Sequence, residues 1–343
     1  MPLILAIESS CDETAVAILR GEPGRPAEVL ASEIASQIDL HRAYGGVVPE
    51  LASRNHSLHL RPLIERALET AGVGIREIDV FGATSGPGLA SSLLIGSTAA
   101  KALAAATGKP FVAVNHLEGH LLSPFVDRGE IPPHLALVVS GGHTLLLDVA
   151  GAGHYRRIGS TRDDAAGEAF DKVAKMLGLP YPGGPEIEQT AAAGNPTAFD
   201  FPRSMLKEAN FDFSFSGLKT AVLYTLTDRD PDHGTPQPAD LPDLCASFQQ
   251  AVVDVLLAKT LRAAADLGRE TVALSGGVSL NAVLRNAFRE GCQSSGRQLI
   301  LAKPQLCTDN AAMIGFAGLH HHFKGHHAPL DTGIDPNLPL ALG

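Results

Sequence analysis

The chain of 343 residues has no tryptophan and few aromatic or charged residues. Aromatic residues make up 5% of it and charged residues 19%, whereas 45% are hydrophobic. This balance excludes the polar, highly charged composition of an intrinsically disordered protein and is typical of a globular one. Because a single hydrophobic core seldom serves a chain of this length, we expect two compact lobes.

Cysteine is also scarce, and the four cysteines form no Cys-x-x-Cys pair. A disulfide framework is not expected in so large a chain, which favours a reducing compartment. The N-terminus lacks the basic segment and the long apolar segment of a signal peptide. No stretch approaches the roughly 20 apolar residues that cross a membrane. We therefore predict a soluble, cytoplasmic protein that does not act on membranes.

Positive charge is in deficit, since the formal net charge is -10. Proteins that bind nucleic acid through their own surface are normally basic. Binding to RNA must therefore rely on a local basic surface or on a partner. The candidates for a local basic rim are Lys172, Lys175, Arg203, Lys207 and Lys219, although each of them alone is more often an ordinary surface residue.

A pattern of apolar run, polar turn and apolar run opens the chain at residues 3–19 and recurs at 135–149. Each copy predicts two strands joined by a turn, and the recurrence suggests an internal duplication. Strands then alternate with helical stretches, which indicates an α/β fold with partly parallel sheets. We expect a first lobe over 1–130 that a helix over 310–325 completes, a second lobe over 131–309, a surface loop over 226–242 and a loose tail over 326–343.

Three turns rich in serine or glycine follow apolar strands, at Glu8–Asp12, Ser140–His143 and Ser275–Val278. Peptide N–H groups in such turns can hold a phosphate, and glycine lets the backbone approach it closely. One such turn alone is more often only a tight connection. The three together predict a nucleotide site in a cleft between the lobes. The chain contains neither a GxxxxGK[ST] loop nor a GxGxxG turn behind its first strand.

His116 and His120 lie four residues apart, directly after a predicted strand. On a helix both imidazoles share a face and can bind one metal ion, although such pairs are as often ordinary core or surface residues. In the HExxH helix of zinc proteases Glu follows the first His, but here Leu117 holds that place and Glu118 lies about 100° further round. Asp309 is a candidate third ligand, and a His₂-carboxylate set suits iron or zinc. Spacing alone does not join Asp309 to the pair.

Taken in order, seven motifs are similar to those of the universal tRNA N6-threonylcarbamoyladenosine transferase family. The resemblance extends from about residue 3 to about residue 319, which is nearly the whole chain. The motifs are ILAIESSCDETAVAI, NHLEGH, VSGGHT, GEAFDKVAKMLGL with YPGGP, FSFSGLKTA, LSGGVSLN and CTDNAAMI.

The resemblance implies the two-lobed ASKHA fold of actin and sugar kinases, with a cleft between duplicated lobes. It implies transfer of the threonylcarbamoyl group of threonylcarbamoyl-AMP to the N6 amine of the adenosine beside the anticodon, in tRNAs that read codons starting with A. It implies one divalent metal ion per subunit, with Fe²⁺ favoured over Zn²⁺. In bacteria it also implies two partners, a catalytically silent paralogue and a small P-loop ATPase.

The same resemblance assigns roles to single residues. It implies His116, His120 and Asp309 as metal ligands, and the turn after the second-lobe strand as the contact with phosphate and acyl group. The family usually has Asp where this chain has Glu188, so the ribose contact there is in doubt, and Glu186 could replace it. The general base is unassigned, with Glu13 as one candidate. The implied substrate-binding residues are Val139, Ser140, Gly141, Gly142, His143, Asp171, Gly184, Glu188 and Asn281.

Other classes of function stay open at this point. An ASKHA small-molecule kinase explains the glycine turns but has no use for the histidine pair. A non-catalytic sensor of adenine nucleotides binds without turnover, and a metalloprotease is disfavoured by the position of Glu118. A further group of histidines near the C-terminus is interpreted as a surface feature that can bind stray metal. It comprises His320, His321, His322, His326 and His327.

Overall fold

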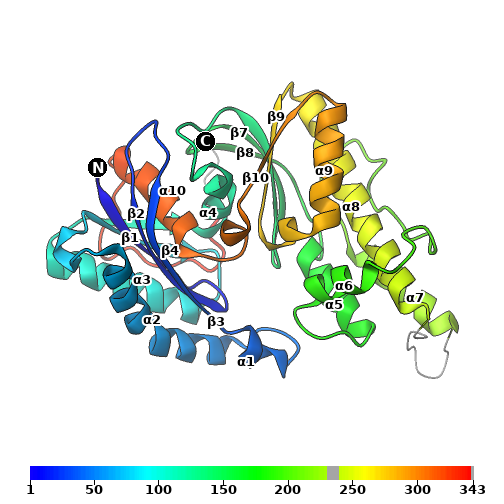
Figure 1. Cartoon of the computed structure of the whole chain (residues 1–343), viewed down its shortest axis with the longest axis horizontal. Helices are drawn as coiled ribbons and strands as arrows, with labels where there is room; N and C mark the ends of the chain where they lie inside the picture. The colour runs from blue at the N-terminus through cyan, green and yellow to red at the C-terminus, as the bar shows by residue number, and fades with distance from the viewer. Residues whose placement is uncertain (230–238, 341–343) are drawn as a thin grey trace. The chain divides into compact units, whose positions relative to one another are not determined.

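The computed structural model describes residues 1–229 and 239–340. They form two compact units: unit 1 contains Met1–Pro132 and the described chain from Ala302, and unit 2 contains Pro133–Leu301 (Figure 1). The sequence predicts a second lobe that reaches residue 309, but unit 2 ends with its last strand at Leu301. Asp309 consequently belongs to unit 1, together with His116 and His120.

Unit 1 is built on a five-stranded mixed sheet of order β3-β2-β1-β4-β5. The first three strands pair antiparallel, and β4 and β5 add parallel to β1. The strands are β1 (Leu3–Glu8), β2 (Glu13–Arg20), β3 (Glu28–Ser36), β4 (Val80–Gly86) and β5 (Phe111–Asn115), and the helices are α1 (Ile38–Arg42), α2 (Pro49–Ala71), α3 (Ala90–Thr107), α4 (His116–Leu122) and α10 (Ala311–Phe323).

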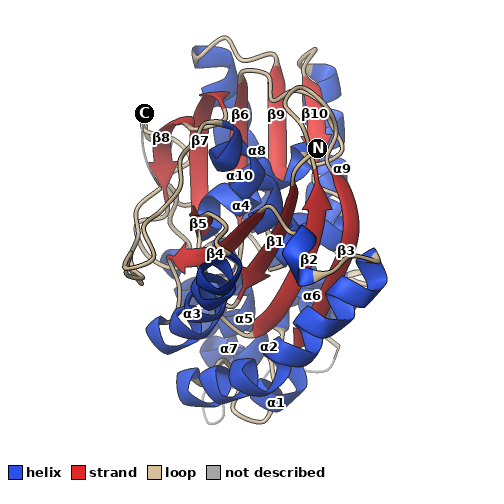
Figure 2. Cartoon of the chain, turned by 90° about the vertical axis from the view of Figure 1, so that its left-hand side faces the viewer, coloured by secondary structure: helices blue, strands red, loops and turns tan. Residues whose placement is uncertain are grey.

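Helices cover both faces of this sheet, which explains why β1 is buried at every position and apolar from Leu3 to Ile7 (Figure 2). Alternate residues of a strand point to opposite faces. Leu5 and Ile7 lie in the core beneath α2 and α3. Ile4 instead faces α10, where a Cβ on Gly318 would lie only 2.6 Å from its side chain. Continuous apolar runs are typical of strands that are buried on both faces.

Unit 2 repeats the same sheet. Its order from β8 is β8-β7-β6-β9-β10, with β6, β7 and β8 antiparallel and β9 and β10 parallel to β6. This identical topology confirms the internal duplication predicted from two short segments. The strands are β6 (His134–Val139), β7 (Thr144–Gly151), β8 (His154–Ser160), β9 (Thr271–Ser275) and β10 (Gln298–Leu301), and the helices are α5 (Ala166–Met176), α6 (Gly183–Ala191), α7 (Ser216–Arg229), α8 (Leu241–Asp266) and α9 (Ala282–Ser294).

Within the described ranges, α8 is the one helix that is long and apolar enough to cross a membrane. However, 72% of its apolar stretch is buried inside the protein. Phe248, for example, packs edge-to-face on Phe170 at a ring distance of 5.1 Å. The helix is therefore a core helix of unit 2. The predicted loop over 226–242 begins within the last turn of α7, and residues 230–238 lie outside the described chain.

The described part of the C-terminal tail differs from the expected loose segment. Backbone hydrogen bonds join it to unit 1, from Ala328 N to Phe111 O at 2.8 Å and from Asp335 N to Ser85 O at 2.9 Å. The tail has no regular spacing of apolar residues, and it binds unit 1 through backbone groups. Its position could therefore not be predicted from the sequence pattern. Residues 341–343 lie outside the described chain.

Helix α3, which follows Gly88, is rich in small residues, and these residues pack within unit 1. Gly96 N donates a hydrogen bond to Ser9 Oγ at 3.2 Å, and Ser9 Oγ donates to Ser92 O at 2.9 Å. A Cβ on Gly96 would lie 2.4 Å from Ser9 Oγ and 3.0 Å from Ile7 Cγ2. The close approach of α3 to β1 therefore requires glycine at this position.

We expect Gly96→Ala to destabilise the protein by about 1–3 kcal/mol, because overpacking at this contact outweighs the gain in helix propensity of about 1 kcal/mol. The measurement is the midpoint of thermal unfolding. Thr98→Ala, at an exposed position of the same helix, is the control and should leave the midpoint nearly unchanged. An unchanged or raised midpoint for Gly96→Ala would contradict the close packing of α3 on β1.

Candidate metal centre and nucleotide-binding residues

The two candidate histidine ligands lie on α4, which begins where β5 ends. Asn115 caps this helix, since its Oδ1 accepts a hydrogen bond from Leu117 N at 2.9 Å. His116 and His120 are one turn apart and therefore project from the same face. Their rings lie edge-to-face with centroids 4.8 Å apart, and both are buried.

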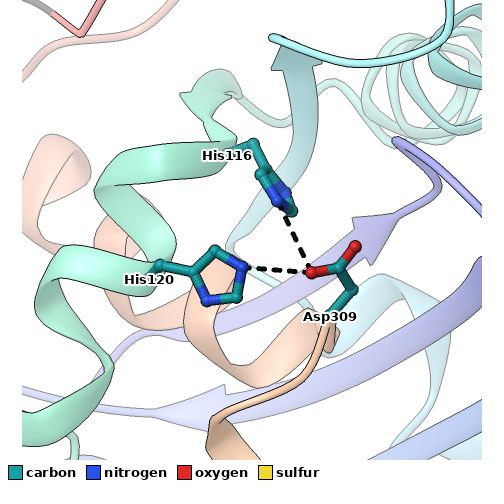
Figure 3. Close-up of side chains that lie close together, drawn as sticks. All are labelled: His116, His120 and Asp309. Atoms are coloured by element: carbon teal, nitrogen blue, oxygen red, sulfur yellow. Dashed lines mark hydrogen bonds and ion pairs between the residues drawn. The ribbon is translucent and has the colours of Figure 1, made fainter. Parts of the chain in front are cut away.

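Asp309 meets this pair from a distant part of the chain, directly before α10. Its Oδ1 lies 3.0 Å from His120 Nε2 and 3.5 Å from His116 Nε2 (Figure 3). One donor atom from each of the three residues lies within 4.8 Å of the others. Across residues 1–229 and 239–340, this is the one group of three or more such side chains that could hold a metal ion. Sequence spacing did not connect Asp309 to the histidine pair, and the fold brings this candidate third ligand to them.

The chemistry of these donors fits one divalent ion. Two imidazole nitrogens and one carboxylate oxygen suit iron or zinc and leave coordination positions for a substrate. Both histidines turn Nε2 towards the same carboxylate oxygen, so the three donors converge on one point. His116 Nδ1, on the far side of its ring, is held by a second carboxylate. Such a carboxylate–histidine pair is typical of metal centres.

That second carboxylate belongs to Glu8, which the sequence analysis missed as a site residue. Its Oε2 lies 3.1 Å from His116 Nδ1 and accepts a hydrogen bond from Thr84 Oγ1 at 2.6 Å, while its Oε1 accepts one from Ser10 N at 2.5 Å. The side chain is fully buried. The sequence did contain a signal for Glu8, since it is an acidic residue at the end of an otherwise apolar strand. A carboxylate buried at such a position requires polar partners and is therefore a candidate site residue.

The charges of Glu8 and His116 stabilise each other. Burial favours the neutral carboxyl group of Glu8, but the charge and hydrogen bond of His116 outweigh burial and hold the pKa of Glu8 below its ordinary value. Burial likewise opposes protonation of His116, yet the carboxylates of Asp309 and Glu8 raise the pKa of His116 to about 9. An entering metal ion must therefore displace a proton from His116 at neutral pH.

Glu13, the candidate base, begins β2 close to the same acidic group. Burial, together with the charges of Asp12 and Asp309, raises the pKa of Glu13 to about 10. Ser36 Oγ donates a hydrogen bond to its Oε1 at 3.2 Å. A carboxyl group with this pKa is protonated at neutral pH and cannot accept a proton there. The role of Glu13 as a base stays a prediction.

Glu118 lies on α4 between the two histidines but serves a different contact. Its Oε2 lies 2.7 Å from Nε2 of His321 on α10, and its side chain is only 8% exposed. In a zinc protease the glutamate beside the first histidine acts on a metal-bound water. Glu118 instead joins α4 to α10, which agrees with the sequence-based argument that disfavours a metalloprotease.

The histidines near the C-terminus separate into different environments. His320 packs edge-to-face on Phe316, and His322 Nδ1 lies 3.0 Å from His327 Nε2. His326 lies near His321, with ring centroids 6.0 Å apart. These residues form no group of three converging donors in the part of the chain that the structure describes. The group on α4 with Asp309 is therefore the candidate metal centre of the described chain.

In unit 2, the turn from Ser140 to His143 joins β6 to β7. Ser140 N donates to His143 O at 2.8 Å, and His143 N donates to Ser140 Oγ at 3.2 Å, so these two N–H groups close the turn itself. Cβ atoms on Gly141 and Gly142 would meet nothing within 4 Å. Gly276, with φ +90°, lies against this turn, since its Cβ would fall 2.3 Å from Val139 O. The second and third serine–glycine turns therefore lie side by side at the carboxyl ends of β6 and β9.

The other predicted substrate residues lie in unit 2, where Asp171 and Glu188 each bind the N-terminal end of a neighbouring helix. Asp171 Oδ1 accepts from Gly183 N at 2.7 Å, which holds the start of α6 against α5. Glu188 Oε1 accepts from Ala282 N at 2.7 Å, so this carboxylate reaches the start of α9.

Asn281 caps α9 by accepting from Leu284 N at 2.9 Å. Its amide nitrogen also donates to Gln249 Oε1 at 2.6 Å. A Cβ on Gly184 would meet nothing within 4 Å, so the backbone there is open. The substrate residues implied by the resemblance thus lie in unit 2, at β6, α5, α6 and α9.

The predicted basic rim is largely neutralised by nearby carboxylates. Lys172 pairs with Asp164 and Glu168, each at 2.8 Å, and Lys219 lies 3.5 Å from Asp164. Arg203 Nη2 lies 2.8 Å from Asp254. Because these charges are already paired, they contribute less to the attraction of a phosphate backbone than their number suggests.

Two solved structures share this architecture. The HypF of T. kodakarensis gives a TM-score of 0.65 at 13% identity over 95% of this chain and 48% of that one. The activator of the 2-hydroxyisocaproyl-CoA dehydratase from Clostridium difficile, with bound ADPNP, gives 0.51 at 14% identity over 94% and 96%. Likenesses at such low identity concern the fold alone, and they place the chain in the ASKHA class of duplicated α/β proteins, here with a candidate metal centre in unit 1.

Sequence comparison then defines the family. The family profile for tRNA N6-adenosine threonylcarbamoyltransferase matches residues 28–316. A relative of that name from Anaeromyxobacter sp. (strain Fw109-5) is 53% identical over 335 residues, which are 97% of this chain and 98% of the relative. Another from Moorella thermoacetica is 49% identical over 98% of this chain and 97% of the relative. The chain belongs to the tRNA N6-adenosine threonylcarbamoyltransferase family.

We expect Glu8→Gln to weaken metal binding about 10–100-fold, because the amide removes the carboxylate that orients His116. The measurement is the dissociation constant for Zn²⁺, obtained by competition with a chromophoric chelator. Glu22→Gln, a carboxylate in the loop after β2, is the matched control. Equal Zn²⁺ affinity for Glu8→Gln and the unaltered protein would refute the positioning role of Glu8.

Metal binding should also depend on pH. Because the pKa of His116 is raised to about 9, one proton competes with the ion at every pH below that value. We expect the apparent affinity for Zn²⁺ to rise by up to about tenfold per pH unit from pH 7 to pH 9 and then to level off. A profile that is flat over this range would show that His116 does not bind the proton in competition with the ion.

Proposed function

We propose that this chain catalyses threonylcarbamoyl transfer to tRNA with one divalent metal ion held by His116, His120 and Asp309. As a tRNA N6-adenosine threonylcarbamoyltransferase, it acts on the N6 amine of a tRNA adenosine. The donor is threonylcarbamoyl-AMP, and the adenosine is the one adjacent to the anticodon in tRNAs that read codons starting with A. The observation that carries the proposal is the convergence of both histidines on Asp309 within a full-length family match.

The ligand set suits iron or zinc and leaves open coordination positions, and the family resemblance favours Fe²⁺ over Zn²⁺. When bound, the ion supplies a Lewis acid that polarises and orients the threonylcarbamoyl group. Glu8 accepts a hydrogen bond from Nδ1–H of His116 and so leaves Nε2 as the ligand atom. Asp309 contributes the negative charge that balances the ion.

The nucleotide part of the donor is assigned to unit 2. The turn after Val139 presents Gly141 and Gly142 to open space, and their N–H groups are the donors for the phosphate and the developing oxyanion, because Ser140 and His143 close the turn. Asp171, Gly184, Glu188 and Asn281 contact the adenosine and ribose. Glu188 holds Ala282 N with one oxygen, and we assign its other oxygen to a ribose hydroxyl.

The transfer itself is an acyl substitution. The N6 amine attacks the carbamoyl carbon, a C–N bond forms, the C–O bond to phosphate breaks, and AMP leaves with the electron pair. AMP is a good leaving group, so little acid catalysis is required. The amine loses one proton, for which Glu13 is a candidate acceptor only once its carboxyl group is ionised. Most of the rate enhancement comes from holding two large substrates in position.

The charge of the chain favours help from a partner in binding tRNA, and the family resemblance implies which partners these are. With a net charge of -10 and several basic side chains already paired, this surface alone binds tRNA weakly and in a salt-dependent way. We propose that a catalytically silent paralogue and a small P-loop ATPase complete the working assembly in the cytoplasm.

The test is a reconstituted reaction with threonine, bicarbonate, ATP, the adenylate-forming enzyme, the two partners and unmodified tRNA. Nucleoside mass spectrometry should detect N6-threonylcarbamoyladenosine with the unaltered protein. We expect His116→Ala to abolish both the product and the bound metal, because it removes one of three ligands. Full transfer by this variant without metal would overturn the proposal.

The control is His59→Ala, which removes an exposed histidine of α2 and should retain product and metal. All variants are made in a background with His322→Ala and His327→Ala. These two surface histidines lie close together and, once replaced, cannot add to the measured amount of bound metal. Circular dichroism confirms that His116→Ala is folded. A folded protein that binds adenine nucleotide but forms no product in any variant would favour the sensor or the kinase reading instead.

A further inference from the structure

The C-terminal segment over residues 334–340, here called the C-terminal strap, lies across the ends of β4 and β5. Asp335 N donates to Ser85 O at 2.9 Å, and Pro336 O accepts from Gly88 N at 3.1 Å. Asn115 Nδ2 donates to Leu338 O at 3.3 Å and to Pro339 O at 3.1 Å. The strap is therefore bound to unit 1 at both strand ends, through backbone carbonyl and N–H groups.

The contact of the strap with Gly86 is too close for any side chain. A Cβ on Gly86 would lie 1.9 Å from Asp335 O and 2.8 Å from the Cβ of Leu338. Gly86 also has a φ of +149°, which residues other than glycine rarely adopt. Upstream of the strap, Lys101 Nζ donates to Thr332 O at 2.8 Å. The close fit at Gly86 shows that the strap occupies a defined place in unit 1.

One route from the strap to the metal centre is through Asn115. The two ends of this amide have different tasks: Oδ1 caps α4 at Leu117 N, and Nδ2 is held by two carbonyl groups of the strap. The next residue is His116. The strap therefore fixes the side chain that sets where α4 begins and in which direction its two histidines project.

A second route leads through the loop after β4. Leu89 N donates to Ser10 O at 2.8 Å, and a Cβ on Gly88 would lie 2.6 Å from the same oxygen. Ser10 Oγ lies 3.2 Å from His116 Nδ1, beside the carboxylate of Glu8. Because the strap binds both Ser85 and Gly88, it also fixes the loop that packs against Ser10. Ser10 in turn contacts His116.

We infer that the C-terminal strap is a positioning element of the metal centre, which acts on His116 through Asn115 and through the loop at Ser85–Gly88. The inference rests on the proposed role of His116, His120 and Asp309 as ligands. It assigns a function to residues 334–340, which act on the ligands indirectly, through other residues of unit 1. Loss of the strap should weaken metal binding, while the cores of both units, which lie elsewhere, remain intact.

The first test uses the full-length chain with Asn115→Ser. Serine keeps a good helix cap and the same charge but lacks the amide group that donates to the strap. We expect the dissociation constant for Zn²⁺ to rise about 10–100-fold, as for other groups that orient metal ligands. Asn55→Ser is the matched control, because Asn55 Nδ2 donates to a backbone carbonyl on α2, away from the site.

A second variant ends the chain after Gly333, which keeps Thr332 and removes the strap. We expect the same loss of affinity, a changed visible spectrum of the Co²⁺ form because the ligand geometry is altered, and nearly the same unfolding midpoint without metal. A chain that ends after Leu340 is the control and should bind like the full chain. If truncation prevents folding, the full-length Asn115→Ser variant alone decides.

The outcomes separate this inference from the proposed function. Unaltered protein that binds no Zn²⁺ or Co²⁺ would refute the metal centre and the strap together. Tight binding by the unaltered protein and equally tight binding by Asn115→Ser would overturn the role of the strap alone. Weaker binding by Asn115→Ser and by the truncated chain, with unchanged binding by both controls, would establish it.

Discussion

The contact between the His120 imidazole and the Asp309 carboxylate joins two segments that are 189 residues apart, and much of unit 1 is arranged around it. Asp309 directly precedes Asn310, which caps α10, and His120 lies one turn beyond His116 on α4, which Asn115 caps. Side-chain caps fix the first turn of a helix, so each cap also fixes the neighbouring ligand. The geometry of the centre therefore depends on the relative positions of the first turns of α4 and α10. The contact between Glu118 and His321 joins the same two helices further along their length.

Electrostatics explains why so many groups surround this contact. Glu8 and Asp309 bring negative charge into a buried region, where an unpaired carboxylate is costly. Part of the compensation comes from His116, whose pKa is raised to about 9 by the two carboxylates. Burial and the charges of Asp12 and Asp309 also raise the pKa of Glu13 to about 10, which favours the neutral form of its carboxyl group. A divalent cation at the same point would balance the negative charge better than a proton on one imidazole.

The two units show how one topology supports two kinds of chemistry. Each has a sheet of three antiparallel strands with two parallel strands added, yet the carboxyl ends of the central strands carry different side chains. In unit 1, β1 ends in Glu8 and β5 leads into the histidine helix. In unit 2, β6 and β9 end in serine–glycine turns that leave the backbone accessible. The fold places loops at these ends, and the residues in the loops determine what each unit can bind.

Much of this could be predicted from the sequence, because the signals are local. Apolar runs gave the strands, the repeated strand–turn–strand pattern gave the duplication, and the i, i+4 spacing put His116 and His120 on one helix face. The motifs in their order were sufficient for the family and its activity. Glu8 could have been found as well, from an acidic residue at the end of a buried strand.

What only the tertiary structure decided concerns contacts between distant segments. The return of the chain to unit 1 after Leu301 brings Asp309 to the histidine pair. The spacing of apolar residues in the sequence does not predict this contact between distant segments. The strap docks through backbone carbonyl and N–H groups, which are the same in every residue and so leave no trace in composition. Local periodicity specifies helices and strands, whereas the close approach of remote segments depends on the shape of the whole folded unit.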